Sequence, residues 1–259
     1  MRLIDSHCHL NYKGLVEQQP AILERARAAG VFGFLNISTK EEEWPQIAGV
    51  TDREPDVWAT VGVHPHYADD HLHVTSDTLV AAALHPKVIG LGETGLDYHY
   101  DYSDRAAQEA VFRRHIAAAK ATGLPLIVHT RDAEEDTQTI LREELSEDVF
   151  SAVIHCFTGS KPFATAMLNL GFYISLSGIV TFKNAKTLHE LATMVPGDRL
   201  LVETDSPFLA PVPHRGAVCE PAFVRDTLRF VAELRGVSAD RLAEQTTANF
   251  FRLFSKAAA

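Results

Sequence analysis

The chain has 259 residues and is poor in cysteine and in basic side chains. Its three cysteines, Cys8, Cys156 and Cys219, are an odd number without zinc-finger or Cys-x-x-Cys spacing. A disulfide framework is therefore not expected, and a reducing compartment such as the cytoplasm is. Lysine and arginine number 24 against 34 acidic residues, for a formal net charge of −10. This balance argues against a protein that coats nucleic acid through a basic surface, although not against one that grips a few nucleotides.

Long hydrophobic runs are also missing. The start, Met1-Arg2-Leu3-Ile4-Asp5, has no apolar secretory segment, and no run approaches the length that spans a membrane. At the same time 46% of the residues are hydrophobic, which is ample for a sizeable core. We therefore expect a folded cytoplasmic protein with no membrane partner and no obligate protein partner.

The chain does contain a regular alternation of short, apolar, β-branched runs with longer helical patterns. This alternation is typical of repeated β-α units around a parallel sheet. The predicted strands lie near 2–9, 32–38, 57–63, 87–93, 124–129, 151–156, 172–177 and 200–205. The predicted helices are Pro20–Ala29, Lys40–Thr51, Ser76–Leu84, Ser103–Thr122, Asp132–Leu145, Lys161–Leu170, Asn184–Met194, Pro221–Arg235 and Ala239–Phe254.

Eight strands with eight or more helices predict an α/β protein that is a single (β/α)8 barrel of the TIM type. We expect one domain over residues 1–259, because no low-complexity linker interrupts the pattern. An open, doubly wound sheet is the competing architecture, since it shows the same alternation. In a barrel the carboxyl ends of all the strands meet at one mouth, where barrel enzymes keep their chemistry.

Five of the predicted strands run apolar and then stop on a histidine or a carboxylate. The six side chains concerned are His7, His9, Glu93, His129, His155 and Asp205. Imidazole and carboxylate groups are what a divalent-metal site needs. The sequence therefore predicts a metal site at the C-terminal mouth of the strands, and with it a metal-dependent hydrolase.

The spacing of these residues supports that prediction. His7 and His9 are two apart on a strand, so they share a face. His129 and His155 end adjacent strands, and two such histidines beside a His-x-His pair favour metal over a structural role. Asp205 ends the eighth strand, which neighbours the first in a closed barrel, so it should arrive beside His7 and His9.

Residues next to these ligands have predicted roles of their own. Asp5 is either a partner behind the ligands or a structural aspartate, and Glu203 should share the face of Asp205 as a supporting carboxylate. Cys8 and Cys156 should point the other way, toward the helices, as small buried side chains. His64 ends the third predicted strand. It is a candidate for binding the substrate or for supporting a metal ligand from behind, and a purely structural role is equally open.

The segment Gly90-Leu91-Gly92-Glu93-Thr94-Gly95 matches the Gly-x-Gly-x-x-Gly dinucleotide fingerprint in form. We reject that reading, because a carboxylate stands where a pyrophosphate needs backbone N–H groups and no helix follows. The glycines are better explained as letting the backbone turn tightly beside a metal-ligating Glu93.

Six ligands exceed the needs of one tetrahedral zinc. They suit two metal ions bridged by a carboxylate, a pair that can activate water and stabilise both attacking and leaving oxygens. A single metal with Asp205 as general base and the spare histidines on the substrate is an equally open interpretation.

Seven motifs along the chain resemble those of a known family. They are Asp5-Ser6-His7-Cys8-His9-Leu10, Gly62-Val63-His64-Pro65-His66, Gly92-Glu93-Thr94-Gly95-Leu96-Asp97-Tyr98, Ile127-Val128-His129-Thr130-Arg131-Asp132-Ala133, His155-Cys156-Phe157-Thr158-Gly159-Ser160, Glu203-Thr204-Asp205-Ser206-Pro207-Phe208-Leu209-Ala210-Pro211 and Thr246-Thr247-Ala248-Asn249. The family is that of the TatD metal-dependent deoxyribonucleases, within the metallo-dependent hydrolase barrels. So many motifs in one order, over nearly the whole chain, argue against a chance match.

The resemblance implies a specific ligand set and activity. It implies that His7, His9, Glu93 and Asp205 hold one metal ion and that Glu93 bridges to a second. It assigns the second ion to His129 and His155. It also implies two divalent ions, Mg²⁺ or Mn²⁺ with Zn²⁺ as an alternative, with Glu93 and Asp205 in catalysis. The implied activity is cleavage of DNA in repair or degradation, often 3′-to-5′ on single strands.

One segment departs from the family. The loop after the last ligand usually reads Arg-Gly-Lys-x-Asn-Glu-Pro, whereas here it is Arg215-Gly216-Ala217-Val218-Cys219-Glu220-Pro221. A basic and an amide side chain are missing, which weakens the expected grip on substrate in that loop. His64, Arg131 and Arg215 remain the predicted substrate-binding residues, with Lys13, Lys161 and Lys183 as further basic groups just after strand ends.

Two other functions compete with nuclease action. One is a metal-dependent esterase or amidohydrolase, acting on mischarged aminoacyl-tRNA or on a small cyclic amide, since the same activated water would serve. The other is a non-enzymatic metal-binding protein. The presence of Asp205 as a possible base beside a full ligand set argues against the latter, because metal storage needs no base.

Overall fold

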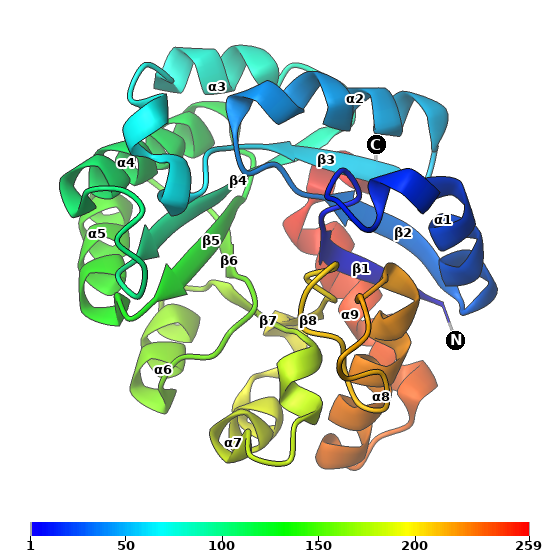
Figure 1. The fold of residues 1–259 in the computed structure, drawn as a ribbon. Helices are drawn as coiled ribbons and strands as arrows, with labels where there is room; N and C mark the ends of the chain where they lie inside the picture. The colour runs from blue at the N-terminus through cyan, green and yellow to red at the C-terminus, as the bar shows by residue number, and fades with distance from the viewer. Residues whose placement is uncertain (1, 259) are drawn as a thin grey trace.

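The computed structural model describes residues 2–258, so Met1 and Ala259 of the predicted domain lie outside it. Eight parallel strands form one sheet in sequence order, with helices around it (Figure 1). The strands are β1 (Leu3–Cys8), β2 (Val31–Asn36), β3 (Val57–Val61), β4 (Val88–Asp97), β5 (Leu126–Arg131), β6 (Ala152–Ile154), β7 (Tyr173–Leu176) and β8 (Leu200–Val202).

Helices follow the strands and cover the outside of the sheet (Figure 1). The α-helices are α1 (Gln19–Ala28), α2 (Trp44–Arg53), α3 (Ser76–Ala82), α4 (Arg105–Thr122), α5 (Glu134–Glu147), α6 (Lys161–Asn169), α7 (Lys186–Met194), α8 (Val224–Arg235) and α9 (Ala239–Leu253). Short 3₁₀ helices are η1 (Val16–Gln18), η2 (Glu41–Glu43), η3 (Pro65–Tyr67), η4 (Asp69–His71), η5 (Gly178–Thr181), η6 (Gly197–Arg199), η7 (Pro221–Phe223) and η8 (Ser255–Ala258).

The first and last strands meet and bring the sheet to near closure. The backbone N–H of Asp205 donates to the carbonyl of His7 at 2.9 Å, and the N–H of His9 donates to the carbonyl of Ser206 at 2.8 Å. These bonds join the C-terminal end of β1 to the segment that follows β8, at the mouth. The predicted TIM-type barrel is therefore confirmed, and the open doubly wound sheet is excluded.

The interior of the barrel has an apolar layer toward the N-terminal ends of the strands, which we call the floor. A polar layer lies next to it, toward the C-terminal ends. Ile127 on β5 and Val153 on β6 belong to the floor, and His129 and His155 follow two residues later on the same faces. Helix α9 supplies aromatic side chains from below. The buried members of this inner cluster are Ile4, Leu35, Ile37, Ile89, Ile127, Val153, Tyr173, Leu201, Phe250, Leu253 and Phe254.

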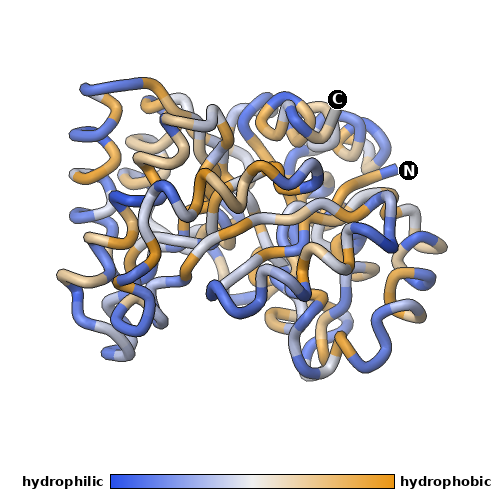
Figure 2. Tube along the Cα trace, turned by 90° about the horizontal axis from the view of Figure 1, so that it is seen from above, coloured by the Kyte–Doolittle hydropathy of each residue, from blue (hydrophilic) through white to orange (hydrophobic). Residues whose placement is uncertain are grey.

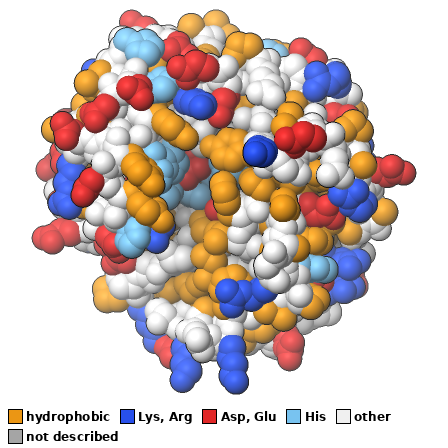
Figure 3. Space-filling model, in the orientation of Figure 1, with side chains coloured by type: hydrophobic (Ala, Val, Ile, Leu, Met, Phe, Trp, Pro, Cys, Tyr) orange, Lys and Arg blue, Asp and Glu red, His pale blue; other side chains and the backbone are white. Residues whose placement is uncertain are grey.

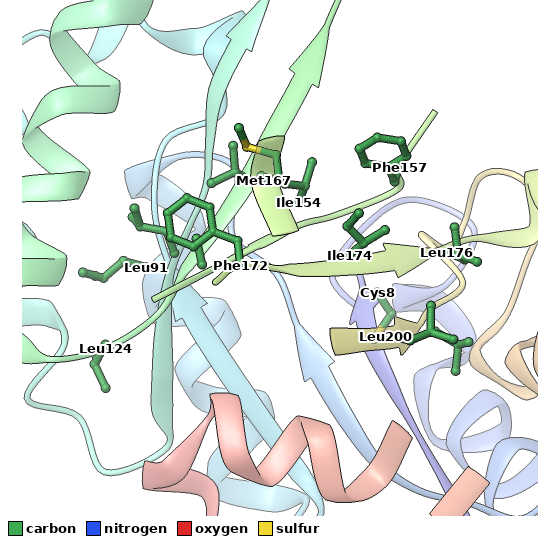
Figure 4. Packing of buried hydrophobic residues seen from close by; sticks show 14 of the residues in the cluster. Cys8, Leu91, Leu124, Ile154, Phe157, Met167, Phe172, Ile174, Leu176 and Leu200 are labelled. Carbon is green, nitrogen blue, oxygen red and sulfur yellow. The ribbon is translucent and has the colours of Figure 1, made fainter. Parts of the chain in front are cut away.

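A second, larger cluster fills the space between the strands and the surrounding helices. Leu91, Ile154 and Ile174 face outward from β4, β6 and β7 into it (Figure 4). The helices contribute one apolar stripe each, so hydrophobic and hydrophilic residues alternate along them (Figure 2). In residues 2–258 no helix is both long enough and apolar enough to cross a bilayer.

All eight predicted strands are present, but several ligands do not stand at strand ends. Strand β4 continues to Asp97, so Glu93 lies in its middle, and β5 continues past His129 to Arg131. Strand β8 ends at Val202, three residues before Asp205. The prediction placed strand ends where the apolar runs stop, whereas hydrogen bonding between β4 and β5 continues as far as Asp97 and Arg131.

Candidate metal centre

A cavity of about 660 Å³ opens at the mouth of the barrel, above the polar layer. Figure 3 shows it as a hollow with histidine side chains in its wall and hydrophobic side chains around it. Its lining residues are His9, Tyr12, Thr39, His64, His66, Tyr67, Glu93, Tyr100, His129, Thr130, Arg131, His155, Cys156, Thr158, Ile179, Asp205, Phe208 and Leu209. Five of the six predicted ligands line the cavity, and the sixth, His7, is buried directly behind them.

Glycines in β4 bring Glu93 into this cavity. Gly92 and Gly95 have φ angles of 136° and 139°, which L side chains rarely adopt. A Cβ on Gly92 would lie 2.6 Å from the carbonyl oxygen of Ile127, and one on Gly95 would collide with the carbonyl of His129. The strand continues to Asp97 instead of opening a helix. The glycines therefore serve the close approach of β4 to β5 beside Glu93 and not the predicted tight turn, while the rejection of the dinucleotide fingerprint is confirmed.

Asp205 reaches the site through a left-handed residue. Its φ is 58°, a conformation that Asp and Asn tolerate better than most residues. Because its N–H is bonded to the carbonyl of His7, the turn after β8 is held against the end of β1. The aspartate side chain is thereby aimed at His7 near the end of β1 and at His9 just after it.

The two carboxylate oxygens of Glu93 face different groups of histidines. Oε2 lies 3.4 Å from Nε2 of His7 and 3.8 Å from Nε2 of His9. Oε1 lies 2.9 Å from Nδ1 of His129 and 2.7 Å from Nε2 of His155. One carboxylate therefore stands between two clusters of nitrogen atoms, as a bridging ligand would.

The first cluster consists of His7, His9 and Asp205. Oδ1 of Asp205 lies 3.5 Å from Nε2 of His7 and 3.4 Å from Nε2 of His9. The two Nε2 atoms are 3.3 Å apart, and His7 stacks on His155 with ring centroids 3.9 Å apart. The same side-chain atoms are close enough together to ligate one cation.

The electrostatics of the site favour a bound cation. Burial by itself would raise the pKa of Glu93, but the charge of His155 and the hydrogen bonds with His129 and His155 hold that pKa well below its ordinary value. For Asp205 burial is again the largest single effect, but the hydrogen bond with His9 and the neighbouring histidines together lower its pKa. Burial and the neighbouring His155 lower the pKa of His7. Both carboxylates are therefore ionised at neutral pH, as cation binding requires.

The donor set fits divalent metal ions. The Nδ1 of His9 lies 3.3 Å from the carbonyl oxygen of Ile37, and because a carbonyl can only accept, the neutral ring carries its hydrogen on Nδ1 and keeps a lone pair on Nε2. Among the described residues, the buried Nδ1 of His7 has no hydrogen-bond partner, so no contact there sets which of its nitrogens carries the hydrogen. Nitrogen and carboxylate donors without a thiolate suit Mn²⁺, Zn²⁺ and, with fewer nitrogens, Mg²⁺.

His64 differs from the other histidines because its tautomer is set by a neighbour. Its Nδ1 accepts a hydrogen bond from the backbone N–H of His66 at 3.1 Å. Burial lowers the pKa of His64 to about 4, so the ring is neutral and its hydrogen sits on Nε2. That Nε2 lies 3.4 Å from Oε1 of Glu93. His64 therefore presents a hydrogen-bond donor to the site instead of a metal-binding lone pair, although its distances alone also fit a ligand.

The second cluster consists of His129 and His155 beside Glu93. Two further carboxylates orient the rings of these two histidines. Oδ2 of Asp97 lies 3.0 Å from Nε2 of His129 and 2.9 Å from Nε2 of His66. Oε1 of Glu203 lies 3.3 Å from Nδ1 of His155 and accepts from the N–H of Cys156 at 2.7 Å. The supporting role of Glu203 was predicted from the sequence, whereas the roles of Asp97 and His66 were not. The available signal was spacing, since Asp97 follows Glu93 by four residues along β4.

Asp5 proves to be the structural aspartate. Its carboxylate accepts from the N–H of Thr204 at 2.9 Å and from the Thr204 hydroxyl at 2.6 Å, which ties β1 to the end of β8. Burial raises the pKa of Asp5 to about 8. It therefore fixes the segment that carries Asp205 and does not contact a ligand ring.

The structure confirms the predicted orientation of Cys8 and contradicts that of Cys156. Cys8 is fully buried against the carbonyl of Leu35, as predicted. Cys156, however, lines the cavity, because its φ of 41° turns it out of the alternation of β6. Its Sγ lies 3.2 Å from the hydroxyl of Ser177, and burial raises the pKa of the thiol well above its ordinary value. A protonated thiol is a poor metal ligand.

The predicted basic residues are scattered. Arg131 lines the cavity, with its guanidinium 4.9 Å from the ring centroid of Tyr100. Arg215 is exposed and lies 4.0 Å from the ring centroid of Phe182. Lys161 is paired with Glu190, while Lys13 and Lys183 are exposed. Lysine and arginine side chains do not gather around the hollow in Figure 3.

Comparisons with known proteins match the whole length of this architecture. A family described as TatD related DNase matches residues 4–255, a range that includes all six predicted ligands. The uncharacterized metal-dependent hydrolase YcfH of Escherichia coli K12 is 45% identical over 98% of this chain and 96% of its own. The 3′-5′ ssDNA/RNA exonuclease TatD of Erwinia tasmaniensis is 36% identical over 98% of this chain and 100% of its own.

Solved structures show the same fold. The TatD homologue YjjV of Escherichia coli K12 superposes with a TM-score of 0.91 at 28% identity, covering 98% of both chains. A TatD-family hydrolase of Entamoeba histolytica superposes with a TM-score of 0.86 at 21% identity over 98% of both chains, which speaks for the fold alone.

Proposed function

Because the chain belongs to the family of TatD-related DNases and is a metal-dependent hydrolase, we propose that it cleaves phosphodiester bonds of DNA as a 3′-to-5′ exonuclease on single strands. The observation that carries this proposal is Glu93, whose two oxygens face two separate clusters of histidines. A metal pair with a shared carboxylate is suited to phosphoryl transfer, since it stabilises the attacking and the leaving oxygen together. The exonuclease activity of the Erwinia relative supports the choice of substrate.

The shape of the site supports action at strand ends. The clusters lie at the bottom of the barrel mouth, and His7 and Glu93 are almost fully buried. A single strand that enters end-first would bring its terminal phosphodiester bond to this depth. We also propose that residues 1–259 act as one hydrolase domain, because β1 and β8 are joined at the site itself.

In this proposal each residue has a stated task. His7, His9, Glu93 and Asp205 hold one ion, and Glu93, His129 and His155 hold a second. A divalent ion held there acts as a Lewis acid, which makes a water molecule more acidic and stabilises negative charge on a phosphoryl oxygen.

The remaining work falls to side-chain atoms of the chain. Asp205 accepts the proton of the attacking water on its carboxylate, which is ionised and open to the cavity. His64 donates from Nε2, to Glu93 or to a phosphoryl oxygen of the substrate. Asp97 and Glu203 keep the rings of His129 and His155 in place.

The direct test is product analysis on single-stranded oligonucleotides labelled at either end. We expect stepwise shortening from the 3′ end in the presence of Mn²⁺ or Mg²⁺, with a duplex of the same sequence degraded more slowly. If no oligonucleotide is cleaved under any of these conditions, the nuclease proposal is wrong. Hydrolysis of an aminoacyl ester by the same preparation would then favour the esterase alternative.

Replacing Glu93 with glutamine should lower the metal content of the purified protein. The amide keeps the shape but loses the charge that serves both clusters, so metal affinity should fall by at least the ~10- to 100-fold that loss of a ligand-orienting partner costs. Metal analysis per mole of protein measures this. Glu144→Gln is the matched control, because Glu144 pairs with Arg113 and Lys120 on the outer helices. Unchanged metal content in Glu93→Gln would contradict the bridging role.

Binding of single-stranded DNA should depend only weakly on salt. If two or three basic groups contact phosphates, the slope of log affinity against log salt should be about −1.5 to −2. Arg131→Gln should flatten that slope by about 0.7 and weaken binding for all sequences alike, since phosphate contacts carry no base information. The measurement uses the Asp205→Asn protein, so that DNA survives, at fixed divalent ion.

Arg199→Gln is the control for this experiment. Arg199 also lies over a tyrosine, Tyr173, but at the start of β8 and therefore at the opposite end of the barrel. It should leave the slope unchanged. A slope steeper than about −5 would mean an extended basic track and would overturn the proposed grip by a few groups.

A further inference from the structure

Two exposed tyrosines in the loop between β4 and α4 have no part in the chemistry above. Tyr100 is 37% exposed and Tyr102 is 65% exposed. Their rings stack on each other, with centroids 5.1 Å apart and an angle of 8° between the planes. We refer to this pair, Tyr100 and Tyr102, as the tyrosine platform. Exposed aromatic faces of this kind bind nucleobases without regard to sequence, because every base has a π-face.

The tyrosine platform begins at the edge of the metal centre. Tyr100 lines the same cavity as Glu93 and His129. The ring of His66 meets both tyrosines edge-on, with centroids 5.4 Å from Tyr100 and 4.9 Å from Tyr102. The His66 ring lies in turn 6.2 Å from that of His129. A base on the platform would therefore belong to a nucleotide within a few positions of the cleaved bond.

The loop that carries the platform is held at both ends. Oδ1 of Asp97 accepts hydrogen bonds from the N–H groups of His99 at 3.0 Å and Tyr100 at 3.1 Å. The hydroxyl of Ser103 donates to the carbonyl of His66 at 3.0 Å. Because Asp97 also contacts His129, the loop and the metal centre share one anchor. A preorganised surface loses little entropy when a ligand binds.

Charge around the platform distinguishes bases from phosphates. The guanidinium of Arg131 lies 4.9 Å from the ring centroid of Tyr100 and offers a contact for a phosphate. Tyr102 borders a second, smaller cavity of about 330 Å³ whose charged lining residues are Asp69, Asp101, Asp104 and Arg105, so carboxylates outnumber the one guanidinium. Those carboxylates repel a phosphate but not a neutral base. The DNA backbone is thus directed toward Arg131, which leaves the base for the tyrosines.

We propose that the tyrosine platform is a base-stacking subsite that holds one nucleobase of a single strand, through the exposed ring of Tyr102, while the strand end lies at the metal centre. This proposal rests on the proposed nuclease function and specifies how that substrate is held. Tyr102 is the residue to test, because Tyr100 also contacts Arg131 and its loss would disturb the phosphate contact as well.

The experiment uses the metal-loaded protein and a set of single-stranded oligonucleotides of one sequence. Each carries one abasic site, placed at successive positions from the 3′ end, and kcat/KM is measured for each. Stacking of a base on an aromatic side chain contributes about 5- to 100-fold. With the wild-type protein we expect a loss of this size at one position near the 3′ end. Tyr102→Ala should lose the same factor on the intact oligonucleotide and nothing further when that base is removed.

Control variants separate stacking from other effects. Tyr102→Phe keeps the ring and should behave as wild type. Leu84→Ala removes another exposed apolar side chain, between α3 and the start of β4 and so at the opposite end of that strand, and should do the same. If Tyr102→Ala shows the full abasic loss at every position where wild type does, or if Tyr102→Phe is as impaired as Tyr102→Ala, the platform does not bind a base. Failure to cleave any oligonucleotide, by contrast, would count against the nuclease function itself.

Discussion

Asp205→Asn should lower kcat by about two to four orders of magnitude, the usual contribution of a positioned general base, while KM changes little. Asparagine tolerates the left-handed φ of 58° at this position, so the backbone can stay as it is. What is lost is the charge that accepts a proton and attracts a cation. Steady-state kinetics on a labelled single strand measure both constants, and a thermal melt checks that the variant is folded.

The matched control is Asp198→Asn. Asp198 lies in η6 before β8, is exposed and pairs with Arg199, so the same chemical change there should leave kcat unaltered. If Asp205→Asn retains kcat within about threefold of wild type, the residue is a bystander and the assignment of the base is wrong. A change confined to KM would place Asp205 in substrate binding alone.

Removal of divalent ions should abolish activity, by more than about a hundredfold, since Lewis-acid stabilisation is worth several kcal/mol. This prediction rests on the composition of the site, which is buried and contains two ionised carboxylates and four histidines but no thiolate. Four imidazoles are more than Mg²⁺ usually accepts, so we expect Mn²⁺ to restore activity at lower concentration than Mg²⁺. The measurement is activity after chelation and dialysis, followed by titration with each metal.

Stability gives a second readout for the same experiment. An ion that binds the folded state at 100 times its dissociation constant stabilises the protein by about 2.7 kcal/mol. For a chain of this size the melting temperature should then rise by about 5–10 °C when metal is returned. Full activity in protein shown to be metal-free would refute the metal-dependent mechanism, and Glu93→Gln should show a much smaller rise in melting temperature.

The fold was predictable because its signal is local. Apolar runs of strand length alternate with helical patterns throughout, and at this chain length the alternation leaves few architectures. The convergence of the six predicted ligands was predictable for a related reason. Ile127 and His129, or Val153 and His155, are two residues apart, so an apolar residue in the floor implies a neighbour on the same face in the layer above.

The corrections come from contacts between strands. Glu93 lies inside β4 because pairing with β5 continues beyond it, past a shift in register between Leu91 and Thr94. Cys156 faces the cavity because one left-handed residue interrupts the alternation of β6. Apolar periodicity within one strand carries no information about the length of its partner or about a single positive φ.

The sequence by itself determined the barrel and named the six residues from which a metal centre can be built. The tertiary structure alone decided how they are used: which oxygen of Glu93 faces which histidines, that His64 offers a hydrogen and not a lone pair, and that Asp97 joins His129 to His66. It also placed Tyr100 against Tyr102 beside the cavity. The physical reason is that folding patterns depend on near neighbours in the chain, whereas ligand geometry and tautomers depend on atoms that only the closed barrel brings within hydrogen-bonding distance.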